Sequence, residues 1–567
     1  MPEYVTPGVY FERVDAAPPL VGSRTDIAGF VGLAQRGPMG SSARVDSWPQ
    51  FQSKFGSFVP WGYLAYAVKA FFENGGRTCF VARVAGPTAA AASIVLRRAD
   101  GTPAVRIEAL DPGTWARRQL AVSVVNVRPG EKKFSVHVIV DRALAESFPD
   151  VSTDATADYF VRRVNDGTRA RGPSQWIKVT DLLPGTGSLP DPVKSGMVAG
   201  TAFLDGGDDG LASLAVDDFL GTRLPAASAT ASPAGLAALA EVEAVAILAV
   251  PDIHVRPAEL PPPAPPRRPP PHDPCCPLDR AAADPTALTP PPAAADAPPL
   301  FTDAQVIAVQ RAMIEQCEAL RNRVAVIEVP LAQGSMKARA VQGALDWRNQ
   351  LASDRGFAGL YHPWVKVIDP LLDGAVRPVP PCGHVCGVYA RADLTRGVHK
   401  APANEETLWA EDLTVLIDDR AQGVLNPAGV NCLRPFPGRG VRCYGGRTIS
   451  TDPDWRYVNV RRLMCMIETT LARGMQWSVF EPNDWPVRQA LVAQVTTFLD
   501  GLWRRGALVG RSAAEAFFVR CDETNNPQSE VDNGRLYVDV GVAPTLPAEF
   551  VVFRIGRTAE ELEVVER

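Results

Sequence analysis

The segment from Cys382 to Cys386, which reads Cys-Gly-His-Val-Cys, holds the residue types of this sequence that best suit metal chemistry. Thiolate and imidazole groups are the ligands that zinc prefers, and His362 and His399 lie nearby in the sequence. However, no second cysteine pair follows at zinc-finger spacing, and a loop that places His384 between two cysteines would surround a metal incompletely. We therefore expect loop or strand residues without metal. A zinc hydrolase built on Cys382, His384 and Cys386 stays open as the competing class of function.

Other candidate sites are weaker. The run Asp205–Gly210 is similar in outline to a calcium loop, but its third position is Gly207 and its twelfth is Val216, where a bidentate glutamate belongs. We interpret it as a glycine-rich turn. Cys275 and Cys276 beside His272 lie among prolines that stiffen the backbone. No Gly-Lys-Ser/Thr phosphate loop and no Gly-x-Ser-x-Gly elbow occurs in the sequence, so we expect no catalytic residue, no cofactor and no metal.

Two arginine pairs, Arg461–Arg462 and Arg504–Arg505, lie on or at the end of expected helices. A cation at a helix C-terminus complements the helix dipole, which explains Arg504–Arg505. Solvated faces or salt bridges explain the other pair. Contact with an acidic protein surface is the alternative for both pairs, and the residues alone do not decide between these interpretations.

Composition bounds the class of protein. At about 150 residues per domain, 567 residues indicate three or four domains. The net charge of −5 argues against a broad cationic surface for nucleic acid or anionic lipid. The longest apolar run, 244–250, is far shorter than the roughly 20 residues that span a bilayer, so we expect no membrane insertion. The N-terminal residues contain Glu3 and Glu12 and no apolar stretch, which predicts no cleaved signal.

Ten cysteines are too few for a disulfide scaffold, and half of them sit among apolar neighbours, which predicts buried thiols in a reducing compartment. These five are Cys79, Cys317, Cys432, Cys465 and Cys521.

The elements that would position these residues indicate an α/β core. Residues 244–250 and 324–329 are continuous apolar runs, typical of strands covered on both faces, and an amphipathic helix begins between them near Asp303. Further helices are expected over 457–472 and after Asp484, which would cap a helix with Pro486 in its first turn. A strand is expected near Val365–Ile368.

Two stretches interrupt this pattern. Residues 87–200 are rich in strand signals: Ile94–Leu96 and Val105–Ile107 flank Asp100-Gly101, which predicts a hairpin. We expect an inserted β-rich module there. Many of the 52 prolines cluster in 257–299, which predicts an extended, solvated surface loop.

Blocks along nearly the whole chain occur in the order found in one known family. The N-terminal blocks are TPGVY (6–10), GFVGLAQRGP (29–38), YLAYAVKAFFENGG (63–76) and LDGGDDG (204–210). The C-terminal blocks are YHPWVKVIDP (361–370), GVYARAD (387–393), KAPANEE (400–406), LNPAGVNCLRPFPGRG (425–440), GGRTIS (445–450), YVNVRRL (457–463), WSVFEPND (477–484) and APTLPAEFVVFRI (543–555). With these blocks the chain resembles contractile tail sheath proteins of phage tails, R-type pyocins and contractile injection systems.

Three segments depart from the family pattern. The loop around 380–386 usually lacks the paired cysteines, DPGTWARR (111–118) usually continues differently after its tryptophan, and the proline-rich stretch has no general counterpart. The cysteines therefore look like local variation.

The resemblance implies a mixed α/β (α+β) discontinuous core, an inserted β-rich outer domain, and extended N- and C-terminal β-strand arms. The expected boundaries are an N-terminal arm at 1–20, core at 21–86, outer domain at 87–200, core again at 201–545 with the 257–299 loop, and a C-terminal arm and tail at 546–567. The expected strand arms comprise Val9, Tyr10, Phe11, Phe550, Val551, Val552, Phe553, Arg554 and Ile555.

The resemblance also implies a structural, non-enzymatic role. Six-fold rings of subunits would stack helically around an inner tube and contract from a metastable extended state to drive the tube through a target envelope. The expected partners are other copies of the chain, the inner tube with Arg504 and Arg505 as candidate contacts, a baseplate and a terminal cap, without nucleic acid. We expect assembly in the cytoplasm into a phage tail or tail-like particle, with release by lysis as one route. A non-contractile adhesive shell with the same fold is a third possibility.

Overall fold

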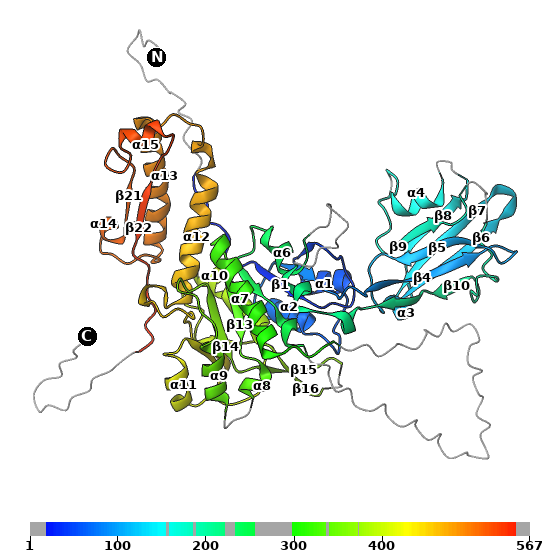
Figure 1. The fold of residues 1–567 in the computed structure, drawn as a ribbon, viewed down its shortest axis with the longest axis horizontal. Coiled ribbons are helices and arrows are strands. Elements are labelled where there is room, and N and C mark those ends of the chain that lie inside the picture. The colour runs from blue at the N-terminus through cyan, green and yellow to red at the C-terminus, as the bar shows by residue number, and fades with distance from the viewer. Residues whose placement is uncertain are drawn as a thin grey trace, which may run out of the picture.

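The computed structural model describes residues 19–154, 158–169, 171–184, 189–221, 233–255, 298–335, 339–371 and 374–550. The expected N-terminal strand residues 9–11, residues 551–555 of the expected C-terminal strand, and residues 257–297 of the proline-rich stretch lie outside the described residues. Three units follow one another along the long axis (Figure 1): a β-rich unit, a central α/β unit, and a module of long helices with a small sheet.

The central unit is built on a nine-stranded sheet of order β17-β20-β19-β14-β13-β12-β1-β3-β2, in which the strands from β19 to β3 run parallel. Every residue of β1, β13 and β14 is buried, as expected for strands covered on both faces. The strands are β1 (Ala28–Gly32), β2 (Ser42–Val45), β3 (Cys79–Arg83), β12 (Ile247–Ala249), β13 (Val324–Glu328), β14 (Ala358–His362), β17 (Glu405–Glu406), β19 (Val430–Phe436) and β20 (Gly440–Tyr444).

Helices on this sheet form two groups. Helices α2 and α10 pack against each other and on the central strands, while α5, α6 and α7 form a second packed group. The helices of the unit are α1 (Trp48–Phe55), α2 (Leu64–Glu73), α5 (Val216–Leu220), α6 (Gly235–Ala240), α7 (Asp303–Leu320), α8 (Leu331–Gly334), α9 (Ala340–Arg348), α10 (Cys382–Arg396) and α11 (Asp419–Leu425). The expected strands at 244–250 and 324–329 and the helix from Asp303 are confirmed. The expected strand at Val365–Ile368 exists but pairs outside the main sheet, in a small sheet of β15 (Val365–Ile368), β16 (Val376–Val379) and β18 (Asp412–Leu413).

The β-rich unit has two four-stranded sheets and its own hydrophobic core. The predicted hairpin around Asp100-Gly101 is confirmed by the antiparallel pairing of β4 and β5. The expected boundary at residue 200 is wrong, because β10 and β11 pair with β6 and β4 and extend the unit to Asp208. The glycine-rich run interpreted as a turn thus forms an edge strand, with positive φ at Gly206 and Gly207. The elements are β4 (Ala90–Arg97), β5 (Pro103–Ala109), α3 (Ala116–Gln119), β6 (Leu120–Arg128), β7 (Lys133–Val140), β8 (Ala143–Ser152), α4 (Phe160–Asn165), β9 (Ile177–Asp181), β10 (Thr201–Phe203) and β11 (Asp205–Asp208).

The C-terminal module has a third core of its own, which the sequence did not separate from the second core segment. The expected helices are confirmed as α12 (Val458–Gly474) and α13 (Trp485–Arg504), and the Asp484 side chain caps α13 by accepting from the Val487 amide at 3.1 Å. The module also contains α14 (Ala513–Ala516), β21 (Phe517–Arg520), α15 (Gln528–Asp532) and β22 (Asp539–Val542). No helix among the described residues is long and apolar enough to cross a bilayer.

The carboxylate of Asp252 ties together the point where the strand order of the central sheet reverses. β1 lies between β3 and β12, and Asp252 follows β12 in a 3-10 turn (Pro251–His254). This buried side chain accepts hydrogen bonds from the amides of Leu33 at 2.6 Å, of Tyr63, and of Leu64 at 3.2 Å. Burial raises the pKa of Asp252 to about 7, and the three amide donors oppose that effect. One side chain therefore holds the end of β1, the turn after β12 and the start of α2 in one body.

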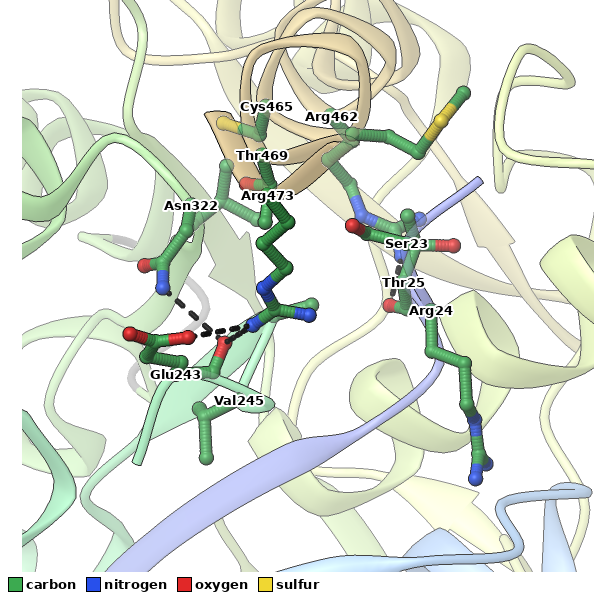
Figure 2. Close-up of a pocket in the computed structure, with 13 residues that line it drawn as sticks. Ser23, Arg24, Thr25, Glu243, Val245, Asn322, Arg462, Cys465, Thr469 and Arg473 are labelled. Atoms are coloured by element: carbon green, nitrogen blue, oxygen red, sulfur yellow. Dashed lines mark hydrogen bonds and ion pairs between the residues drawn. The ribbon is translucent and has the colours of Figure 1, made fainter. Parts of the chain in front are cut away.

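A set of buried charges fixes the C-terminal module to the central unit. Arg462 of α12 donates to the Asp393 carboxylate at 3.0 Å and to the Thr25 carbonyl at 2.9 Å, and the Thr25 hydroxyl donates to Asp393 at 2.6 Å. The side chains of Arg462 and Asp393 are only 2% and 4% exposed. Figure 2 shows the neighbouring pocket at this joint, where Arg473 and Asn322 both donate to the Glu243 carbonyl. The joint is thus a network that spans α12, α10 and the segment before β1.

Removing the Asp252 carboxylate should destabilise the central unit. Asp252→Ala leaves three buried amides without an acceptor, at about 1–3 kcal/mol each, so the free energy of unfolding should fall by at least about 3 kcal/mol. The Asp252→Asn side chain keeps one acceptor oxygen. The free energy of unfolding of this variant should therefore lie between the values for Asp252→Ala and the wild type. Urea unfolding followed by circular dichroism measures the change, and Asp346→Ala on the exposed side of α9 is the control, with an expected change below about 0.5 kcal/mol. An Asp252→Ala midpoint equal to that of the wild type would contradict this role.

Breaking the Arg462–Asp393 pair should loosen the joint. Arg462→Ala leaves a buried carboxylate without its partner, which costs about 3–5 kcal/mol, and should speed proteolysis between the central unit and α12. The double variant Arg462→Met/Asp393→Leu removes both charges and should recover most of the loss. Arg473→Ala breaks a partly exposed pair with Glu243 and should cost less than about 1 kcal/mol. If Arg462→Ala and Arg473→Ala lowered the free energy of unfolding by the same amount, the buried pair would not be what secures the joint.

Candidate subunit-contact surfaces

The C-terminal module carries a sheet of only two strands, β21 and β22, which pair antiparallel from Phe517↔Val542 to Arg520↔Asp539. One face packs on α13 through Phe517, Val540 and Val542, and the other face leaves Phe518 55% exposed. Within the described part of the chain no third strand pairs with either outer edge. Two strands alone are marginally stable, and unpaired edges are templates for another strand. The sheet is therefore a candidate site for strand addition.

The described chain begins against the C-terminal module, and its last residues, 545–550, run from β22 to the side of the central unit (Figure 1). On the N-terminal side, Leu20 packs into the core of the module and lies against Gly474 at the end of α12. On the C-terminal side, Thr545 bonds the Ala507 and Gly506 carbonyls, and Glu549 pairs with Arg447 at 2.9 Å. The first described residues are thus anchored to the module, and the last ones are anchored to the module and to the central unit.

Phe550 is the one residue of the nine expected arm residues that the structure describes, and its side chain is 77% exposed. The pairing of both arms therefore stays a prediction.

The two arginine pairs differ in exposure, because Arg504 and Arg505 are exposed and Arg461 and Arg462 are buried. Arg504 ends α13, is 74% exposed and pairs with Asp500 at 2.8 Å, and Arg505 follows it as an exposed residue. Both are available to a partner, and their contact with a tube stays a prediction. Arg461 and Arg462 are buried, so the interpretation as a solvated face is wrong and the salt-bridge interpretation is confirmed by the pairs Arg461–Glu468 and Arg462–Asp393.

Aromatic rings explain how α12 can bury two adjacent cations. The Arg461 guanidinium lies 4.4 Å and 4.2 Å from the ring centroids of Phe357 and Trp455, and that of Arg462 lies 4.5 Å from Tyr389. Phe357 and Tyr389 come from distant parts of the sequence, whereas Trp455 lies six residues before Arg461, so the spacing of the arginines alone could not reveal their burial.

Cys382, His384 and Cys386 lie on helix α10, and the expectation of a loop or strand is wrong. His384 is turned roughly 200° around the helix axis from Cys382 and stacks on Trp409, whereas the Cys382 thiol donates to Glu328 of β13. Burial raises the pKa of both thiols and lowers that of His384 to about 4. The three side chains do not converge on one point, and no group of three or more metal-ligating side chains is found within the described ranges.

Close packing against α2 explains why helix α10 contains glycines at two positions. A Cβ atom at Gly383 would lie 2.3 Å from the Ala67 carbonyl oxygen of α2, and one at Gly387 would lie 2.7 Å from that of Phe71. The two glycines, four residues apart, thus form the face on which α2 rests. The five cysteines predicted to be buried are all buried and free.

Comparison with known proteins agrees with the architecture. Residues 284–449 match the phage tail sheath protein central domain and residues 450–557 match the phage tail sheath C-terminal domain. The tail sheath protein of Salmonella phage ViI is 25% identical over 283 residues, covering 48% of this chain and 43% of that protein. A putative prophage major tail sheath protein of Pseudomonas aeruginosa (strain UCBPP-PA14) is 26% identical over 268 residues, covering 46% of this chain and 64% of that protein. The chain thus spans about half the length of the curated relatives it matches.

Solved structures share the fold over the whole length. The anti-feeding prophage helical sheath in its contracted state aligns with a TM-score of 0.53 at 20% identity, covering 98% of this chain and 100% of that chain. The sheath complex of the extracellular contractile injection system PVC, also contracted, aligns with a TM-score of 0.52 at 19% identity, covering 99% of both chains. Residues 284–557 thus match both tail sheath domains in sequence, and nearly the whole chain shares the fold of solved contractile sheaths, so the chain is similar to contractile tail sheath proteins in both respects.

Proposed function

We propose that the chain is the structural sheath subunit of a contractile tail-like injection machine. It polymerises in six-fold rings around an inner tube and contracts from a metastable extended state, which drives the tube through a target envelope. The observation that carries this proposal is the C-terminal module, whose two-stranded sheet has no third strand among the described residues and against which the described chain begins at Leu20. The tail sheath proteins that it resembles are structural proteins.

Strand exchange would connect the subunits. Residues 9–11 of one copy and 550–555 of another add to the open edges of β21 and β22, a β-augmentation in which backbone hydrogen bonds supply the affinity. Four or five such bonds at about 0.5–1.5 kcal/mol each give each arm about 2–7 kcal/mol. Because the bonds follow the backbone, the links persist while the folded bodies turn relative to one another.

Contraction is then a rigid-body rearrangement of subunits about their interfaces. The Asp252 carboxylate and the Arg462–Asp393 pair support this because they hold the central unit and the module as one body. The contracted state buries more inter-subunit surface than the extended one, and the difference in free energy performs the work without nucleotide. The β-rich unit lies at the end of the molecule away from the module, which suits an outward-facing position (Figure 1).

The proposed partners are other copies of the chain, an inner tube protein, a baseplate that triggers contraction, and a terminal cap. Solved structures of related fold include a sheath complex and a baseplate of such machines. We place assembly in the cytoplasm, with release of the finished particle by lysis. The tube-facing surface includes the end of α13, where Arg504 and Arg505 meet acidic side chains of the tube.

Deleting residues 1–15 should leave a folded, soluble subunit that cannot build long sheaths. The described core begins after this segment, so the free energy of unfolding should stay within about 1 kcal/mol of the full chain while strand addition is lost. Urea unfolding measures the free energy of unfolding. Negative-stain microscopy of the co-expressed sheath and tube measures the length of the sheaths. Sheaths of normal length from the shortened chain would refute the arm model.

Charge reversal at Arg504 and Arg505 should impair assembly on the tube without affecting the fold. The double variant Arg504→Glu/Arg505→Glu places like charges against an acidic tube surface, so the yield of tube-filled sheaths should fall at least about tenfold, which corresponds to 1.4 kcal/mol or more. Lys178→Glu/Lys194→Glu, which reverses two exposed lysines of the β-rich unit, is the matched control. Equal yields from both double variants would remove α13 from the tube interface.

A further inference from the structure

An open groove with a volume of about 830 Å³ lies where the central unit meets the C-terminal module. Its walls come from the end of α10 and the loop after it, from α11, and from β19 and β20, while residues 545–550 line one side. Among the lining side chains are the cations Arg396, Lys400 and Arg434, together with His399.

The acids that line this groove form ion pairs with arginines, whereas two of the cations that line it do not form an ion pair among the described residues. Asp419 pairs with Arg434 at 2.7 Å, and Glu549 pairs with Arg447 at 2.9 Å. Over the described ranges neither Arg396 nor Lys400 has an ion pair within 4 Å, and the Lys400 ammonium donates only to the carbonyls of Ala401 and Ala403.

A further cation, Arg505, adds to this positive cluster. Arg396 and His399 both line the groove, and the pKa of His399 is lowered first by burial and then by the charges of Arg505 and Arg396. Glu405, the remaining nearby acid, lies 3.9 Å from Arg391, itself a cation. The groove therefore carries an uncompensated positive charge.

The groove also offers apolar surface beside its cations. Tyr444, Leu546 and Phe550 line it and are all exposed. A segment that fits must combine acids with apolar side chains. The last ten residues of this chain, Thr-Ala-Glu-Glu-Leu-Glu-Val-Val-Glu-Arg (558–567), have that composition, with four glutamates against one arginine and with three large aliphatic residues.

We propose that this groove binds the acidic C-terminal tail, residues 558–567, of a second copy of the chain. β22 leads directly into the groove, because Ala543 and Pro544 continue its pairing and residues 545–550 then line the groove wall. A neighbour's strand 550–555 that adds parallel to β22 would deliver its own tail to this groove. This step rests on the proposed strand exchange, and charge attraction screened beyond about 8 Å would hold the tail once the strand is seated.

Binding of the tail can be measured without assembling a sheath. A fluorescent peptide of residues 556–567 is titrated against the chain truncated after Ile555, which keeps the strand. We expect saturable binding that weakens at least tenfold in Arg396→Glu/Lys400→Glu and at 0.5 M NaCl, but not in the Lys178→Glu/Lys194→Glu control. A peptide with all four glutamates changed to glutamine should bind at least tenfold more weakly. Equal binding across these comparisons would overturn the proposal.

A cross-link distinguishes a neighbour's tail from the chain's own. Gly423 lies in the groove with no atom within 4 Å of the position of an added Cβ, so Gly423→Cys is accommodated. Sheaths assembled from a mixture of Gly423→Cys chains and Val564→Cys chains should give a disulfide-linked dimer on a denaturing gel. The opposite result would be that the mixture gives no dimer while the Gly423→Cys/Val564→Cys chain forms an internal disulfide. That result would show that the tail binds its own groove, and it would overturn the proposal.

The test of tail binding in the groove can be separated from the test of sheath formation. The chain truncated after Ile555 keeps both arms, so it should still form sheaths that come apart at lower salt than full-length ones. Failure of every chain to form sheaths, together with normal peptide binding, would count against the proposed function and leave the groove assignment intact. Sheaths of unchanged salt resistance would count against the groove alone.

Discussion

A single buried carboxylate, that of Asp252, is the constraint on which the central unit depends. Open α/β sheets bind their ligands at the point where strand order reverses, and helix N-termini there attract anions. In this chain the Asp252 side chain occupies that point and accepts from the amides that begin α2. The position that an α/β enzyme uses for a phosphate is thus filled from within. At this edge of the sheet, the Asp252 side chain forms a structural joint.

The joint with the C-terminal module follows the same principle, which is that a charged group is buried only where other groups satisfy its hydrogen bonds. Arg462, Asp393 and Thr25 satisfy one another, and Arg461 is paired and covered by aromatic rings. Buried ion pairs add little net stability but penalise every arrangement that separates them. Such a joint suits a subunit that must turn as one body, because it specifies one orientation of α12 on the central sheet. Movement is then confined to contacts between subunits.

Local signals in the sequence predicted the elements well, and the errors arose where distant parts of the chain meet. The apolar runs that became β12 and β13 and the Asp484 cap of α13 are encoded within a few residues. Helix α10 was missed because its glycines lower helix propensity, and only the approach of α2 explains them. The burial of Arg461 depends partly on Phe357, a ring about a hundred residues away in the sequence. Of the candidate contact residues, only Arg504, Arg505 and Phe550 lie in the described chain, so their exposure is established while the arm pairings are not.

In the sheath that we propose, the division between rigid joints and open edges would let one subunit hold its neighbours through a large rearrangement. Buried charges and packed glycines resist small displacements, since any shift leaves a polar group unpaired or a void unfilled. Backbone pairing of a neighbour's strand at the edge of the β21–β22 sheet would depend little on side chains and would turn with the bodies it connects. A cationic groove at the end of that edge adds an attraction that acts over a short range and is screened by salt. Strong links therefore lie where the chain is extended, and weak, adjustable ones lie where folded bodies meet.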